Sequence, residues 1–393
     1  MVDLTKRQFL KRIGSIGLCG TKVLLPNLLL AGCIKQQGRQ LQAADENGVR
    51  LPEGFKSRIV AQSGREVISG QGYLWHGAPD GGACFATDND GWIYVSNSEL
   101  SSANGGCGAI AFNANGHIVD AYPILSGTDQ NCAGGVTPWG SWLSCEEVNE
   151  GRVWECDPTG ATPAIVRPAL GVFKHEAVAV DENTQQLYLT EDKVDGCLYR
   201  FTPNQLTSQG VADLTAGRLE VATLKSGSAT ELNGVILSWQ EIDDPAAQME
   251  PTRYQVSAAV KFNGGEGIVF ADGNIIYTTK GDNKVWSYNT IKQKLSVIYD
   301  EKNSLTPILT GVDNLTVAEN GDIYVAEDGG DLQVVVIDRQ GGLYPIVQLQ
   351  GHDKSEIAGV AFSPDGKRLY FSSQRGTAGK SENGISYEII GPF

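Results

Sequence analysis

Residues and motifs on which many common enzyme sites depend are scarce or missing in this chain. It has only four histidines among 393 residues, too few to favour a histidine-rich zinc site. The sequence has no Gly-x-Ser-x-Gly elbow, no phosphate-binding loop and no His-Glu-x-x-His motif, so a serine triad, a nucleotide-binding loop and a zincin mechanism have no support. Basic residues are outnumbered 31 to 46 by acidic ones, and the net charge of −15 disfavours nucleic acid as a partner and favours cations.

The N-terminal residues 1–32 have the pattern of an export signal peptide. Residues 5–11 (Thr-Lys-Arg-Gln-Phe-Leu-Lys) resemble a twin-arginine (Tat) signal with Lys6 in place of the first arginine. The mostly apolar residues 13–31 follow, but a lysine and a proline interrupt them, which disfavours a membrane-spanning helix. The segment ends in Leu-Ala-Gly-Cys, which resembles a bacterial lipobox. Such a lipobox predicts cleavage before Cys33 and lipidation of its thiol.

These signals predict a protein that is exported to the periplasm and lipid-anchored to the bacterial envelope through Cys33. Ile34 follows the lipobox where an aspartate would retain the protein at the inner membrane, so we expect the outer membrane. Residues 33–50 are polar and glutamine-rich and are predicted to form a flexible tether to a single domain, residues 51–393. Six cysteines remain besides Cys19 and Cys33, and in an oxidising compartment we expect some of them to form disulfides.

An internal repeat predicts the fold of the long domain. Its 48 glycines suit a turn-rich all-β protein. Each repeat has an apolar alternating strand, a turn with Gly, Asn or Asp, and a second strand, which together predict a β-hairpin. The copies occupy residues 83–99, 134–147, 176–192, 266–282, 314–328 and 358–375.

The repeat has the period of a propeller blade. The second strands are centred on one large apolar residue, spaced by 49, 45, 89, 47 and 46 positions: Tyr94, Leu143, Tyr188, Tyr277, Tyr324 and Tyr370. A spacing of 45–49 fits one four-stranded blade. The 89-residue gap holds either a degenerate seventh blade or an insertion near residues 207–257, whose Ser- and Gln-rich character favours an insertion. We therefore predict a six-bladed β-propeller. A β-sandwich would not explain the period.

The repeat also predicts a site at one end of the central channel. The first strand of a blade lines the channel, so residues at its start should meet around one mouth. The position 11 or 12 residues before each central residue is a thiol or an acid in four repeats: Cys132, Glu176, Glu266 and Asp313. In the last repeat Glu356 lies 14 residues before Tyr370, and in the first repeat only Asp80 is available, also at 14.

The ends of the second strands add further acids to this mouth, namely Glu146, Glu147, Glu191, Asp192, Asp282, Glu327 and Asp328. Taken singly, each acid has an ordinary explanation as a turn or surface residue, and Cys132 as a buried or disulfide-bonded thiol. Their shared place in the repeat favours a metal site, because clustered carboxylates repel one another unless cations neutralise them. Oxygen ligands suit calcium, and a thiolate suits iron or zinc. For His175, a supporting and a structural role stay open.

The same segments resemble the PhoX family of alkaline phosphatases. The stretches that carry the resemblance are residues 131–147, 174–181, 188–192, 265–267, 313–316, 327–329 and 358–366. The resemblance implies a propeller with an iron–calcium cluster that hydrolyses phosphomonoesters. It implies Cys132 as an iron ligand and, as carboxylate ligands of iron or calcium, Glu147, Glu176, Glu266, Asp313 and Glu356. Of these, we expect Glu176, Glu266 and Asp313 to act in catalysis on a small phosphate ester.

The chain departs from the family pattern in two ways. It is shorter than well-known members, so we expect fewer loops over the site. The family carries a phosphate-binding arginine two residues before the glutamate matched by Glu266, where this chain has Gly264. Another cation would then have to bind phosphate, and Lys193 and Arg375 are the candidates.

Two other functions are compatible with the sequence. One is a lactonase or related esterase that uses calcium alone and does not need Cys132. The other is a non-catalytic, lipid-anchored propeller that uses calcium structurally and binds a partner. In each case we expect a monomer.

Overall fold

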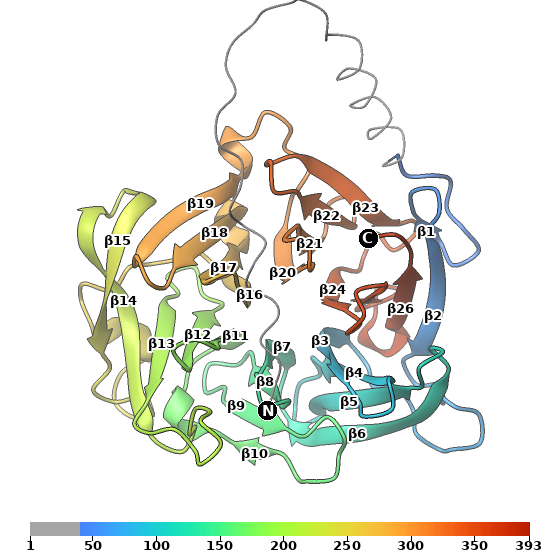
Figure 1. The fold of residues 1–393 in the computed structure, drawn as a ribbon, viewed down its shortest axis with the longest axis horizontal. Helices are drawn as coiled ribbons and strands as arrows, with labels where there is room; N and C mark the ends of the chain where they lie inside the picture. Colours follow the sequence, from blue (N-terminus) through green and yellow to red (C-terminus); the bar gives the residue numbers. More distant parts are fainter. Residues whose placement is uncertain (1–39) are drawn as a thin grey trace, which may run out of the picture. The chain divides into compact units, whose positions relative to one another are not determined.

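The computed structural model describes residues 40–393, which form antiparallel sheets joined by turns. Figure 1 shows these sheets arranged around a common centre, with each sheet running outward from it. No helix between residues 40 and 393 has the length and hydropathy of a membrane span. The predicted signal peptide, the lipobox and Cys33 lie outside the described residues.

Four of the five sheets have four or five strands, each ordered from the centre outward. The first has β3 (Pro79–Ala86), β4 (Trp92–Ser98), β5 (Gly105–Phe112) and β6 (Ile118–Thr128). The next has β7 (Asn131–Val136), β8 (Trp142–Glu146), β9 (Val153–Cys156) and β10 (Ile165–Val166). Another has β20 (Val312–Val317), β21 (Ile323–Glu327), β22 (Gln333–Ile337), β23 (Leu343–Leu349) and β1 (Val49–Arg50). The last has β24 (Ile357–Phe362), β25 (Arg368–Ser373), β26 (Ile385–Ile390) and β2 (Lys56–Gln62).

The fifth sheet has nine strands and joins two units that each begin at the centre. One unit is β11 (His175–Asp181), β12 (Gln186–Glu191), β13 (Leu198–Pro203) and β14 (Gly217–Ser228). The other is β16 (Gly265–Ala271), β17 (Asn274–Thr279), β18 (Lys284–Asn289) and β19 (Lys294–Asp300). β15 (Glu231–Glu241) connects them, pairing along β14 and meeting β19 at one residue pair, Ile236 with Lys294.

Short 3-10 helices lie in the loops between the strands. They are η1 (Pro168–Leu170), η2 (Thr252–Tyr254), η3 (Lys280–Asp282), η4 (Glu301–Asn303) and η5 (Ser381–Asn383). Of these, η3 follows β17 directly and contributes a lysine to the site described below.

The inner strands form a closed ring, which makes the arrangement propeller-like. β3, β7, β11, β16, β20 and β24 each contact the next one, and β24 contacts β3. β11 contacts β16 directly, so the described residues of the 89-residue gap provide no further inner strand. The predicted insertion is smaller than residues 207–257, because β14 completes the outer edge of its own unit. Residues 49 and 50 of the predicted tether lie in β1, paired with β23.

The central residues of the repeat form the core between sheets. Tyr94, Leu143, Tyr188, Tyr277, Tyr324 and Tyr370 are all buried. The clusters combine residues of neighbouring sheets: Leu143 of β8, for example, packs with Val178 of β11 and Leu187 of β12. Burying each such side chain contributes about 1.5–3 kcal/mol relative to exposure. The repeat therefore holds adjacent sheets together and fixes the positions of their inner strands.

A β-bulge interrupts every inner strand near its start. The register shifts fall between Pro79 and Gly82, Asn131 and Gly134, His175 and Val178, Gly265 and Ile268, Val312 and Leu315, and Ala358 and Ala361. A bulge changes the direction of the side chains on either side of it. Neighbouring inner strands approach closely here: a Cβ at Gly267 would lie 2.7 Å from the Cα of Asn314, so only glycine fits.

Candidate metal centre

The residues selected by the repeat lie at equivalent places in the ring. Asp80, Cys132, Glu176, Glu266 and Asp313 are each the second residue of an inner strand, at the bulge, and Glu356 directly precedes β24. All six side chains are buried, although five of them carry carboxyl groups. Buried acids without partners are unfavourable, so this placement points to a compensating charge.

Their ligand atoms form three groups, within each of which all atoms lie within 4.8 Å of one another. The groups are Cys132, Glu147 and Glu176; Glu176, Glu266 and Asp313; and Asp80, Glu99 and Glu356. Glu176 belongs to two groups. The predicted meeting of Cys132, Glu176, Glu266 and Asp313 is thus what the structure shows, while their roles as ligands stay a prediction.

Glu99 was not identified from the sequence, and Asp80 had the weakest place in the repeat. Glu99 follows β4 directly and ends the first repeat as Glu147 ends the second. Its place in the repeat was the available signal. It lies five residues after its central tyrosine, whereas Glu147 lies four after Leu143.

Burial dominates the electrostatics of the ring. It raises the pKa of Glu176, Asp313 and the Cys132 thiol well above their usual values, and neighbouring acids raise them further. Burial raises the pKa of Glu147 to about 10 and that of Glu266 to about 8, the latter in spite of a lysine beside it. The ring therefore holds protons when no cation is present.

Glu176 has an unsatisfied oxygen at the centre of this ring. The Cys132 thiol donates to its Oε1 across 3.3 Å. Its Oε2 is buried and has no hydrogen-bond partner among the described residues. An unpartnered buried carboxylate oxygen is costly unless a further ligand satisfies it.

Each of the three groups is contacted by one basic side chain. The Lys174 ammonium lies 2.8 Å from Glu147, the Lys280 ammonium 2.6 Å from Glu266, and the Arg375 guanidinium 2.9 Å from Glu356. Asp192 accepts from both lysines, at 2.5 and 3.1 Å. Of the two cations proposed from the sequence, Arg375 is therefore at the ring, whereas Lys193 makes no ion pair with any residue in the range 40–393.

The paired acids at the ends of the second strands divide into two kinds. Glu146, Glu191 and Glu327 point away from the ring and accept backbone N–H donors from nearby loops. Glu147 and Asp192 face the ring's lysines instead. The prediction that these acids add to the mouth of the channel is wrong for the first member of each pair, because loop N–H groups already bind its carboxylate.

Two further candidates prove to be structural. Asp282 pairs with Lys284 and accepts from Thr279 within its own hairpin. His175 is buried, contacts the Gly171 carbonyl oxygen at 3.1 Å and packs against the Phe173 ring, and burial lowers its pKa to about 3. It precedes Glu176 and so faces the opposite side of β11.

The expected disulfides are absent from the described residues. All six cysteines after residue 39 are free thiols. Cys145 lies in one hydrophobic core cluster and Cys107 and Cys156 in another, so these buried thiols act as small apolar side chains.

Side chains of the second strands hold the inner strands at the candidate ligands. The Thr190 hydroxyl donates to the Glu266 carbonyl oxygen and the Thr278 hydroxyl to that of Asp313, both across 2.6 Å. Asn97 donates to the Cys132 carbonyl oxygen across 3.1 Å. In each case the donor belongs to a neighbouring unit, so contacts between units position the site.

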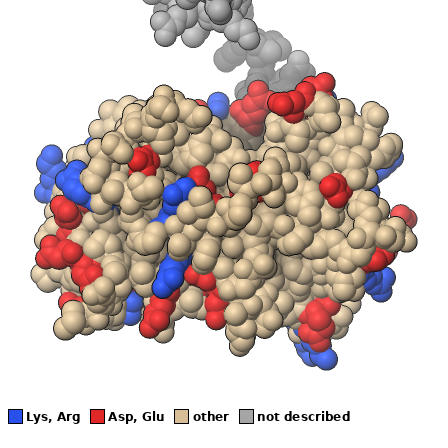
Figure 2. Space-filling view, turned by 90° about the horizontal axis from the view of Figure 1, so that it is seen from below, with Lys and Arg blue, Asp and Glu red and all other residues tan. Residues whose placement is uncertain are grey.

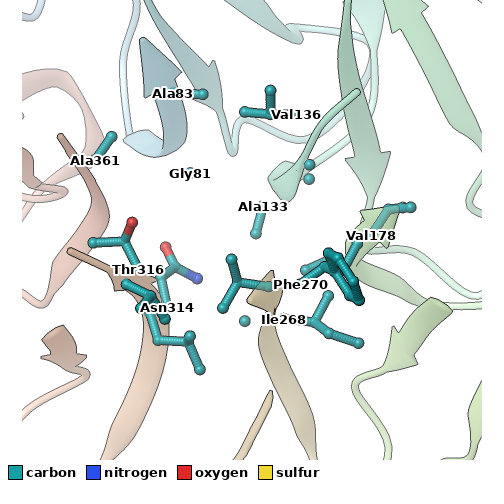
Figure 3. A pocket seen from close by; sticks show the side chains of 18 of the residues that line it. Gly81, Ala83, Ala133, Val136, Val178, Ile268, Phe270, Asn314, Thr316 and Ala361 are labelled. Carbon is teal, nitrogen blue, oxygen red and sulfur yellow. The ribbon is translucent and has the colours of Figure 1, made fainter. Parts of the chain in front are cut away.

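Beyond the bulges most side chains that line the channel are small or apolar. A cavity of about 480 Å³ is lined by the later residues of the six inner strands. Figure 3 shows Val178, Ile268, Phe270 and Val136 around it, with Asn314 and Thr316 as polar side chains. The candidate ligands are not part of its lining.

The family model of alkaline phosphatase PhoX matches residues 113–159 and 149–304. Over these residues the chain matches the PhoX family. The matched part includes three of the inner strands and the residues Cys132, Glu147, Glu176 and Glu266.

The chain is similar to several solved structures, and the first of them shows the same fold. Pseudomonas fluorescens PhoX in complex with vanadate, a transition state analogue, is 17% identical with a TM-score of 0.74, covering 90% of this chain and 98% of that one. A structural genomics protein of unknown function from Bacteroides thetaiotaomicron is 10% identical with a TM-score of 0.51, covering 86% and 76%. A Xanthomonas campestris gluconolactonase has 14% identity and a TM-score of 0.45, covering 89% and 92%. The comparison with curated proteins gives no match.

Gly264 is the position where this chain departs from the PhoX pattern, and the side chain of Lys280 lies beside it. Gly264 has φ +71°, and a Cβ there would lie 2.9 Å from Cγ of Lys280. Lys280 was not identified from the sequence. The available signal was the hairpin register, in which Gly265 pairs with Thr279, so that Gly264 and Lys280 lie opposite each other.

Charge outside the ring is mixed. In the side view of Figure 2, basic side chains stand beside acidic ones on the visible face. Surface pairs of this kind contribute little to stability. The concentration of acids that distinguishes this molecule is therefore the buried one.

Proposed function

We propose that this chain is a metal-dependent phosphoesterase that hydrolyses phosphomonoesters at the ring of buried acids. The observation that carries the proposal is the set of three adjoining ligand groups, with the unpartnered Oε2 of Glu176 among them. The family match supports the same class of hydrolase.

The donor atoms fit the metals that the family resemblance implies. The group with Cys132, Glu147 and Glu176 offers a sulfur and two carboxylates, a set that suits iron. The other two groups offer carboxylate oxygens alone, which suit calcium. We propose that Cys132, Glu147, Glu176, Glu266, Asp313 and Glu356 hold an iron–calcium cluster, with Asp80 and Glu99 completing the oxygen-only group.

When bound, metal ions would polarise the phosphoryl oxygens and offset the negative charge that develops during hydrolysis. Glu176 lies in two groups and so joins them into one site. The thiol proton that Cys132 now donates to Glu176 must leave before its sulfur can act as a ligand. Lys174 and Arg375 contact Glu147 and Glu356 and hold their carboxyl groups in place. These basic residues also reduce the repulsion between the ring and an anionic substrate.

Replacing one ring carboxylate tests the proposal. Glu266→Gln should empty a metal position and abolish turnover of a chromogenic phosphomonoester, because the neutral amide cannot replace the anionic ligand. Metal content is measured by elemental analysis on the same sample. Glu327→Gln is the matched control, since Glu327 is a buried acid that binds Thr310 and Gln333 outside the ring. Full metal content with unchanged turnover in Glu266→Gln would refute the assignment.

A calcium-only esterase is the second candidate, and the two all-oxygen groups favour it. It differs from the first proposal in not needing the thiol of Cys132. A non-catalytic propeller predicts no hydrolysis of any substrate, with chelation lowering thermal stability only.

We further propose that the nine-stranded sheet counts as two blades, which gives six in all. This count is supported by the closed ring of six inner strands. We also propose export and lipid anchoring at Cys33, on the strength of the sequence signals. Loss of membrane association in a Cys33→Ser protein tests that anchor.

A further inference from the structure

Lys280 lies over Gly264 at the end of the β16–β17 hairpin, next to the candidate metal centre. The Lys280 N–H donates to the Gly264 carbonyl oxygen across 2.8 Å. Gly264 is buried, has φ +71° and would place a Cβ 2.9 Å from Lys280 Cγ. Glycine therefore leaves the space that the lysine side chain occupies.

The ammonium of Lys280 has one side held and the other exposed. It lies 2.6 Å from Glu266 Oε1 and 3.1 Å from Asp192 Oδ2. The Lys280 side chain is 37% exposed, whereas those of Glu266 and Asp192 are 3% and 9% exposed. Two buried carboxyl groups thus fix the ammonium, while the partly exposed lysine side chain leaves it accessible to an anion at the mouth of the ring.

Only one of the two partners of Lys280 is a candidate metal ligand. Glu266 belongs to a candidate ligand group, whereas Asp192 belongs to none of the three. When Glu266 becomes a ligand its Oε1 is shared, but Asp192 continues to hold the ammonium. A lysine has three N–H donors, so at least one is then free for a further acceptor. Arg375 differs, because its ion pair is with Glu356, itself a candidate ligand.

We propose that Lys280 binds the phosphate group of the substrate, held by Asp192 in the space above Gly264. This inference rests on the proposed function for the identity of the substrate. A phosphate oxygen would accept a charge-assisted hydrogen bond from the ammonium. In the absence of metal, the same ammonium contacts Glu266.

The experiment measures binding of inorganic phosphate to the metal-loaded protein by calorimetry, together with metal content and the kinetics on a phosphomonoester. Lys280→Met removes the charge and keeps most of the side-chain length. We expect phosphate affinity to fall roughly 10–100-fold, with KM rising and metal content retained. Lys280→Arg should recover most of the affinity. Lys284→Met is the control, because Lys284 pairs with Asp282 and Asp300 away from the ring.

Phosphate affinity within twofold of the unmodified protein in Lys280→Met overturns the inference, as does an unmodified protein that binds no phosphate. Should Lys280→Met fail to fold or to retain metal, Gly264→Ala is the second test. Its new methyl group displaces the lysine stem without removing charge, and phosphate affinity should again decrease. If phosphate binding depends on Lys280 but no phosphomonoester is hydrolysed, the inference stands and the proposed function fails. If a phosphomonoester is hydrolysed equally well with and without the Lys280 ammonium, the proposed function stands and the inference fails.

Discussion

The two ends of the same six inner strands differ sharply in chemistry. At their starts the strands carry Cys132, Glu176, Glu266 and Asp313, all buried and close together. A few residues later they present Val178, Ile268, Phe270 and their equivalents to an apolar cavity. The bulge after the second residue separates the two regions. One strand can therefore contribute to a reactive site and to a structural core without a change of element.

The largest expected difference between the two ends is in activity. Glu176→Gln should lower phosphomonoester turnover by roughly 100-fold or more, because Glu176 joins two ligand groups. Val180→Ala, on the same strand in the apolar part, should cost about 1–2 kcal/mol of unfolding free energy and leave turnover within about threefold. Steady-state kinetics and denaturant unfolding on both variants check this. A similar loss of turnover in both would remove the distinction between the ends.

The candidate sulfur ligand Cys132 distinguishes one ligand group from the two oxygen-only groups. Cys132→Ser should lose iron and most turnover while keeping calcium at the two oxygen-only groups, because a hydroxyl is a poor substitute for a thiolate. Elemental analysis before and after dialysis measures both metals. Retained activity with calcium alone would favour the esterase alternative.

Removal of metal should make the stability of the protein depend on pH through the buried acids at the starts of the inner strands. Burial raises the pKa of Glu266 to about 8 and that of Glu147 to about 10, from an ordinary value of 4.5. The folded state then binds more protons than the unfolded state between these values, so its stability falls as pH rises from about 5 through 8 towards 10. With metal bound, the carboxylates are ligands and the decline should be smaller. Thermal unfolding with and without chelator, from pH 5 to 9, measures it. Rising stability of the metal-free protein over this range would contradict the electrostatic account.

The smallest effect concerns the hydrogen bonds between units. Thr278→Val removes the donor to the Asp313 carbonyl oxygen and should cost about 1 kcal/mol of stability, with metal affinity lowered a few-fold. Thr316→Val, in the lining of the apolar cavity, is the control and should leave metal affinity unchanged. Equal metal affinity in both variants would mean that the Thr278 contact does not position Asp313.

Much of the ring could be predicted because its determinants are local and periodic. The spacing of the central residues and the start of each strand are set by hairpins of nearly constant length, so Cys132, Glu176, Glu266 and Asp313 could be placed at one mouth. The orientation of adjacent acids could not be predicted. Glu146 and Glu147 differ by one residue, and which of them faces the ring depends on where the strand ends and the loop begins.

The sequence by itself determined the repeat, the buried central residues and the meeting of four ring residues, because each depends on strand alternation and short turns. Tertiary structure decided which cation lies beside Glu266, that β15 joins two units into one sheet, and that the described cysteines remain unpaired. These features depend on distances between residues far apart in the chain or across a hairpin end. Such distances are fixed only when the sheets pack around the channel.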